Sequence, residues 1–184
     1  DQDIELNCKT SDNNNAIIYL AQYYSHENAL QIVQLLVDKG IDIRCVTADG
    51  WNTLTTFCRY YSHENLLDIV RLLLDKGIDV QCKAPDGTNA LLFLCRYYSH
   101  PNLLDIIRLL LDKDIDVNYE TSDGWNALLH LCRNYSHENL LDIVRLLLDK
   151  GIDINCKNSD GFNALLPLCR HYSHENLLDI VRLL

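Results

Sequence analysis

The chain has 184 residues, of which 48% are hydrophobic and 23% charged, and its formal net charge at pH 7 is -10. This composition excludes an intrinsically disordered chain, because disordered chains have too few apolar residues to bury a core. Acidic residues outnumber Lys and Arg by 26 to 16, so we expect no nucleic-acid partner, since phosphate backbones bind basic surfaces.

No uninterrupted apolar run exceeds six residues, which is far short of the ~20 that span a bilayer. We therefore expect no membrane partner. The chain contains no Met, and its opening Asp1-Gln2-Asp3 is not followed by the charged and apolar regions of a signal peptide. We expect it to be an excised fragment.

The chain repeats itself with a period of 37 residues. The pair Asp49-Gly50 recurs at that step as Asp86-Gly87, Asp123-Gly124 and Asp160-Gly161. A fixed period of this size is typical of a solenoid, in which each copy packs on the next. We therefore expect one repeat domain over residues 1–184. Its copies are expected at 12–48, 49–85, 86–122, 123–159 and, in part, 160–184, after the remnant of a preceding hairpin at 1–11.

The fourth copy predicts two helices. Asn126 is a suitable N-cap for the first, whose apolar residues follow helical spacing. Ser136 offers an N-cap for the second, which is so apolar that neighbouring copies must cover it from two sides. Only one stripe of that helix is left for water, with Asp142 and Arg145 paired one turn apart. The stripe consists of Glu138, Asp142, Arg145 and Asp149.

The end of the second helix and the segment after it also follow a pattern. Lys150 and Gly151 predict a helix end with a left-handed glycine. Residues 152–156 alternate in hydrophobicity like a short strand before the turn at 159–161, so each copy is expected to be helix, helix and hairpin. Asp114 stands where other copies have glycine, and we expect it to be strained by the same left-handed conformation.

These features resemble the ankyrin repeats. The family pattern, roughly D-G-x-T-P-L-H followed by V-V-K-L-L-L-x-x-G-A-D-V-N, lies over residues 123–128 and 142–156, and the resemblance covers the whole chain. It implies a mainly α, ankyrin-type solenoid of stacked helix-turn-helix units with short β-hairpin or turn connections. The family unit has about 33 residues. The extra residues fall at 135–138, where we expect them to lengthen the second helix.

The eight cysteines form two columns with the period of the repeat. Neighbouring copies should lie about 8–10 Å apart, whereas a disulfide needs Cα atoms within about 7 Å. We therefore expect free thiols, no metal, no cofactor and an intracellular location, cytoplasmic or nuclear. The columns are Cys8, Cys45, Cys82 and Cys156, and Cys58, Cys95, Cys132 and Cys169.

A His-Glu pair such as His137-Glu138 also recurs with the repeat. A catalytic site needs a nucleophile, an orienting group and a pocket, and one pair repeated along a rod supplies none of them. We therefore expect capping and contacts between copies from these histidines, and no enzyme activity. The alternative that these histidines form a stripe that binds a ligand in a pH-sensitive way stays open.

The candidate binding residues are those that change from copy to copy, because stacking contacts repeat in every copy whereas a ligand does not. They occupy the site after each Asp-Gly pair, one site in each first helix, and the hairpin tips. The candidates are Trp51, Thr88, Trp125 and Phe162; Tyr19, Thr56, Phe93 and His130; and Arg44, Val46, Gln81, Lys83, Asn118, Glu120, Asn155 and Lys157.

The resemblance implies that hairpin tips and first helices form a concave face that binds a protein partner. Trp51, Trp125 and Phe162 are then expected to be exposed aromatic anchors, since aromatic residues dominate protein interfaces. The function implied is a non-catalytic scaffold for protein-protein interaction. The alternative is a structural spacer or a self-assembling rod, natural or engineered, that stacks through its ends. For that rod the contact residues would be Leu177, Ile180, Val181 and Leu184.

Overall fold

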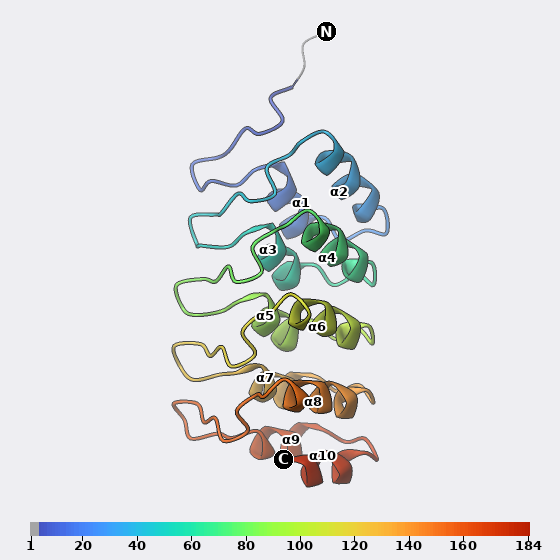
Figure 1. The fold of residues 1–184 in the computed structure, drawn as a ribbon, viewed down its shortest axis with the longest axis vertical. Coiled ribbons are helices and arrows are strands. Elements are labelled where there is room, and N and C mark those ends of the chain that lie inside the picture. The colour runs from blue at the N-terminus through green and yellow to red at the C-terminus, as the bar shows by residue number, and fades with distance from the viewer. Residues whose placement is uncertain (1–3) are drawn as a thin grey trace.

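The computed structural model describes residues 4–184 and shows two columns of stacked helices with loops along one side (Figure 1). The described residues contain ten helices, two in each expected copy. The helices are α1 (Ala16–Tyr23), α2 (Ala29–Asp38), α3 (Thr53–Tyr60), α4 (Leu66–Asp75), α5 (Ala90–Tyr97), α6 (Leu103–Leu111), α7 (Ala127–Asn134), α8 (Leu140–Asp149), α9 (Leu165–His171) and α10 (Leu177–Leu183).

The first helices of the copies pack on one another in chain order, from α1 to α9, and the second helices pack in the same order from α2 to α10. The arrangement is the helical repeat solenoid that the sequence predicts. Residues 1–3 of the expected hairpin remnant lie outside the described residues.

A buried asparagine begins the first helix of a copy. The Asn126 side chain accepts a hydrogen bond from the Leu129 N–H at 3.0 Å, which confirms the predicted N-cap. Its amide nitrogen donates to the carbonyl of Asp153 at 3.1 Å, in the hairpin that follows α8. Asn15 and Asn52 make the same pair of bonds. One side chain therefore caps a first helix and holds the turn connection that follows the second helix.

The second helix ends as predicted. Gly151 has φ of +81°, and the Ile152 N–H donates back to the Leu147 carbonyl at 3.0 Å, as in a Schellman motif. The predicted stripe of α8 is exposed, and Arg145 lies 3.5 Å from Asp142.

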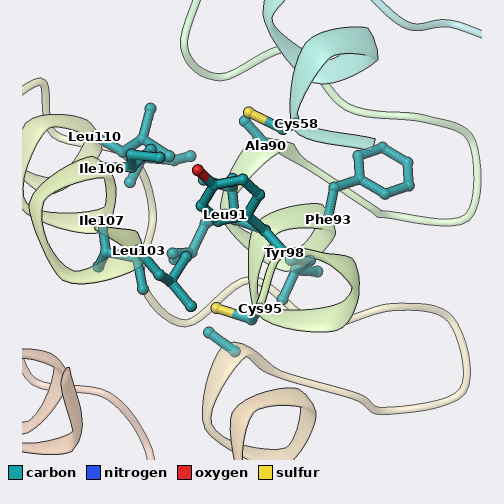
Figure 2. Packing of buried hydrophobic residues seen from close by; sticks show 14 of the residues in the cluster. Cys58, Ala90, Leu91, Phe93, Cys95, Tyr98, Leu103, Ile106, Ile107 and Leu110 are labelled. Carbon is teal, nitrogen blue, oxygen red and sulfur yellow. The ribbon is translucent and has the colours of Figure 1, made fainter. Parts of the chain in front are cut away.

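The core lies between the two columns. Figure 2 shows Leu91 of α5 gathered with Leu103, Ile106 and Leu110 of α6, and all four side chains are fully buried. Because α6 also contacts α4 and α8, neighbouring copies cover it from both sides, as its apolar sequence predicts. Each such side chain contributes about 1.5–3 kcal/mol on burial, and for α6 the neighbouring copies supply part of that burial.

All eight cysteines are free. Cys58, Cys95 and Cys132 are buried between the stacked first helices, and burial raises the pKa of each thiol. Since the thiolate is the reactive form, these three side chains act as small apolar packing groups.

The connections between copies take the expected turn form rather than the β-hairpin form. No strand forms within residues 4–184, where Lys83 and Asn89 make an isolated β-bridge. The predicted strand at 152–156 is therefore wrong. The Asp153 carboxylate accepts the Asn155 N–H at 2.8 Å, which closes an Asx turn in place of the extended run. The equivalent aspartates make the same turn in the three preceding connections.

The tips of these connections stack closely. The Ser122 N–H donates to the Asp86 carbonyl of the preceding copy at 2.8 Å. A Cβ added to Gly87 would lie 2.7 Å from the Glu120 carbonyl oxygen, so only glycine fits there.

The extra residues at 135–138 do not lengthen the second helix, because α8 begins at Leu140. Ser136 is therefore not its N-cap, and that prediction is wrong. The segment forms a turn instead, in which the Leu140 N–H donates to the His137 carbonyl at 3.1 Å. The His137 ring also contributes, since its Nδ1 accepts the Asn139 N–H at 3.4 Å, which supports the structural role expected for the repeated histidines.

This turn ties each copy to the one before it. The buried Tyr135 hydroxyl donates to Asn139 Oδ1 at 2.6 Å and lies 3.3 Å from the His100 carbonyl oxygen, and Asn139 Nδ2 donates to the Pro101 carbonyl at 2.6 Å. We call this pair of side chains the Tyr-Asn staple. It recurs as Tyr61 with Asn65, Tyr98 with Asn102, and Tyr172 with Asn176.

Loss of one staple should destabilise the stack. Tyr135→Phe leaves Asn139 Oδ1 without its donor, and we expect the free energy of unfolding to fall by about 1–2 kcal/mol. The control is Tyr97→Phe, whose hydroxyl belongs to a side chain that is 40% exposed. Urea unfolding followed by circular dichroism measures both. An equal effect of the two substitutions would contradict the staple.

The structure confirms the left-handed conformation predicted for Asp114, whose φ is +59°. In the same copy, Asn89 keeps its capping bond but its buried Nδ2 has no partner. The copy that has Asp114 in place of glycine is thus also the copy in which the capping asparagine makes no bond to the next turn connection.

Replacing this aspartate by glycine should stabilise the protein. Asp114→Gly removes left-handed strain of about 1 kcal/mol, and we expect a higher urea midpoint. Asp112→Gly is the matched control, because Asp112 has φ of -72° and glycine in a right-handed conformation costs about 0.5–1 kcal/mol. An unchanged or lower midpoint for Asp114→Gly would refute the strain.

The last helix does not present all of its apolar residues to solvent. Ile180 is fully buried and Leu177 half-buried, whereas Val181 is 38% exposed. Ile180 was expected among the end-to-end contact residues of the rod, and its burial removes it from any such surface.

Candidate functional site

One side of the stack is formed by the turn connections and the first helices α1, α3, α5, α7 and α9, and we call it the inner face (Figure 1). All the sequence-predicted binding residues belong to these two kinds of segment. They differ widely in exposure, which decides what each can contact.

The residues after the Asp-Gly pairs are not the exposed anchors that the sequence predicts. Trp125 is only 8% exposed, and Trp51 and Phe162 are half-buried. Thr88 is buried as well. For the two tryptophans the physical reason is a ring contact. Trp125 stacks on His130 of its own copy at 5.1 Å, and the Trp51 ring meets the Phe93 ring of the next copy edge-on at 5.3 Å.

The first-helix candidates divide in the same way. Tyr19 is 40% exposed, whereas Thr56, Phe93 and His130 are buried. The Thr56 hydroxyl donates to the Asn52 carbonyl one turn back. Thr56 therefore serves the helix rather than a ligand.

Two of the hairpin-tip candidates connect copies. Asn118 donates to the Gly151 carbonyl at 3.0 Å and accepts the Asp153 N–H at 2.7 Å. In the same manner, Gln81 donates to the Asp114 carbonyl and accepts the Asp116 N–H. The remaining tip candidates are exposed and lie on the rim of the inner face. They are Arg44, Val46, Lys83, Glu120, Asn155 and Lys157.

Aromatic rings and an arginine gather on α3 and α5. Trp51 lies 5.7 Å from Tyr60, and the Arg59 guanidinium lies 3.7 Å from the centre of the Tyr97 ring and 5.0 Å from that of Tyr60. Phe93 completes the group, 6.3 Å from Tyr97. We call these five residues the aromatic cluster. Tyr60 and Tyr97 are 41% and 40% exposed, so the cluster offers ring surface to a partner.

A second feature, which we call the polar pocket, lies further along the stack and has a volume of about 310 Å³. Helix ends supply one side and turn residues the other. Its lining residues are Arg96, Thr121, Asp123, Trp125, His130, Arg133, Asn134 and Asp160.

His130 is the buried member of this pocket. It is 4% exposed, and its buried Nε2 has no hydrogen-bond partner. Burial, together with the nearby charges of Arg96 and Arg133, lowers its pKa to about 4, and Asp123 opposes them in part. The imidazole is therefore neutral at pH 7.

Sequence reasoning missed the residues that are most exposed on this face. Tyr23 is 78% exposed and stacks on Tyr19, and its position does change along the repeats, to Asn134 and His171 in the last two. The arginine position, by contrast, is nearly constant. A search for variation alone assigns such a position to stacking, so it could not have found Arg96 or its equivalents.

Protonation of His130 should be visible in solution. We expect its NMR titration to give a pKa near 4, whereas the unfolded chain takes up that proton near pH 6.5. Stability present above pH 6.5 is therefore lost as the pH falls toward 4. His130→Gln should lose less stability over that interval than the wild type in urea unfolding. A His130 pKa near 6.5 would contradict the buried, unpartnered ring.

The described residues contain no group of three or more His, Cys, Asp and Glu side chains that could hold a metal ion. None of the helices found in that part of the chain is long and apolar enough to cross a membrane.

Comparison with known families agrees with the geometry. A family model described as "Ankyrin repeats (3 copies)" matches residues 2–84, 60–158 and 102–184, which together span nearly the whole chain. A comparison with curated protein sequences gives no match.

Proposed function

The chain belongs to the ankyrin repeat family, and from this we propose that it is a non-catalytic scaffold that binds a protein partner through its inner face. Ankyrin repeats generally mediate protein-protein interaction, and proteins built from them are typically scaffolds without catalytic activity. The family leaves the partner and the contact residues open.

The aromatic cluster is the observation that carries the proposal. Tyr, Trp and Arg are the residue types that contribute most to protein interfaces, and the cluster holds all three. Arg59 contacts the Tyr97 and Tyr60 rings, so a partner would meet a surface that is already ordered and would lose little side-chain entropy on binding. Tyr19 and Tyr23 extend this aromatic surface onto α1.

The hairpin tips supply the polar edge that protein interfaces usually have around such a centre. One exposed tip position changes in charge from copy to copy, and its residues are Val46, Lys83, Glu120 and Lys157. Arg44 is also exposed at a tip. We propose that these tips set specificity, because rim charges steer association and reject wrong partners.

We also propose an intracellular location, cytoplasmic or nuclear. Eight free cysteines fit a reducing compartment, where disulfides are rare.

The test is affinity capture from cell lysate with quantitative mass spectrometry. The baits are the wild type, an inner-face variant with Tyr23→Ser, Tyr60→Ser and Tyr97→Ser, and a control with Leu35→Ser, a residue that is 56% exposed on α2. All three substituted tyrosines are exposed, so we expect the variants to stay folded, which circular dichroism checks.

We expect at least one protein to be captured by the wild type and the control and lost with the inner-face variant. Capture of the same proteins by all three baits would contradict the inner face as the binding surface. Recovery of the bait alone from the wild type would favour the self-assembling rod.

A further inference from the structure

A column of arginines follows the inner face with the period of the repeat. One arginine stands in the last turn of each first helix from α3 to α9. Within residues 4–184, no carboxylate lies within ion-pair distance of any of them. The inner column is Arg59, Arg96, Arg133 and Arg170.

The second helices carry an outer column that provides a contrast. Its arginines have the same spacing, but each is paired with an aspartate one turn before it, at 3.2 to 3.5 Å. The outer column is Arg71, Arg108, Arg145 and Arg182. In a chain whose net charge is -10, the inner arginines are therefore positive charges that the fold leaves without acidic partners.

Aromatic rings hold three of the inner arginines in place. Arg59 and Arg96 lie 3.7 Å and 5.1 Å from the centre of the Tyr97 ring, and Arg133 lies 5.0 Å from the Trp125 ring. A ring contacts the flat side of a guanidinium and leaves the N–H groups on its edge free. Those groups match a carboxylate, which accepts two parallel hydrogen bonds.

The polar pocket brings two of these arginines together. Arg96 from α5 and Arg133 from α7 line it beside His130, whose Nε2 is buried without a partner. A buried polar atom without a partner is destabilising, and an acceptor placed between the arginines would remove that cost, with the neutral imidazole donating from Nε2. The site is thus suited to an anionic oxygen.

The other side of the pocket limits what that anion can be attached to. Asp123 and Asp160 line it from the turns, and Asp123 is already bonded to the Thr121 hydroxyl. A polyanion filling the pocket would meet these carboxylates. A single carboxylate side chain carried on a polar polypeptide segment would reach the arginines. The backbone N–H groups of that segment would then face the two aspartates.

We propose that the polar pocket binds a Glu or Asp side chain of an extended acidic segment in the protein partner, with the inner arginine column guiding that segment along the face. This inference rests on the proposed function and adds the chemistry of the partner. The pocket takes its residues from the third and fourth copies and, with Asp160, from the fifth, so it also fixes the register of the segment.

The test uses a fluorescein-labelled peptide in which Glu and Ser alternate, with a Gln-for-Glu peptide as the uncharged control. Fluorescence anisotropy at low ionic strength measures binding, because surface charge interactions weaken as salt rises. The protein variants are Arg96→Gln with Arg133→Gln on the inner column, and Arg108→Gln with Arg145→Gln on the outer column. The two pairs change net charge equally, and circular dichroism confirms that both fold.

We expect the Glu peptide to bind the wild type and the Gln peptide not to bind. The inner pair should weaken binding at least about tenfold, the loss of one charge-assisted contact, and the outer pair less than about twofold. Equal weakening by both pairs, or no binding of the Glu peptide to the wild type, would overturn the acidic segment. The capture experiment would still report a partner if only this inference fails, so the two failures are distinguishable.

Discussion

The stack depends on a buried asparagine whose two polar atoms serve different elements. In Asn126 the oxygen caps the first helix and the nitrogen holds the carbonyl of Asp153 in the next turn. Because the residue is 2% exposed, neither bond competes with water, and a lost partner is costly. In the copies that contain Asn15, Asn52 and Asn126, the angle between the first helix and its turn is thereby fixed. These two kinds of segment together make the inner face.

The extra residues in each unit add a second constraint, at the opposite end of the first helix. There the Tyr-Asn staple bonds the backbone of the preceding copy, so the first helix is held at both ends. Positions that repeat therefore line up from copy to copy. The same alignment places Arg96 and Arg133 in one pocket, which turns a constant position in the sequence into a binding feature.

The features that the sequence predicts correctly are those set by residues close together in the chain. The asparagine cap, the left-handed glycine, the strain at Asp114 and the apolar second helix all follow from residues within one or two turns of each other. The strand at 152–156 fails because the Asp153 side chain closes a turn on Asn155, a competition that hydrophobic alternation does not register.

The candidate site could be predicted only in part, since exposure depends on what lies beside a residue in space. Trp125 and Trp51 are the same amino acid at equivalent positions, yet Trp125 is buried because a histidine of its own copy stacks on it. The sequence does not show what the tyrosines and asparagines of the Tyr-Asn staple bond, because their partner is the backbone of another copy. The inner arginines are absent from the sequence-based candidates because their position is nearly constant along the repeats.

The most direct measurement is hydrogen-deuterium exchange of the chain with and without the Glu-Ser peptide. If the inner face is the binding surface, added protection should be confined to α5, α7 and the turn around residues 121–125, with the second helices unchanged. Protection on α6 and α8, or none on the first helices, would show that binding occurs elsewhere and would contradict the account.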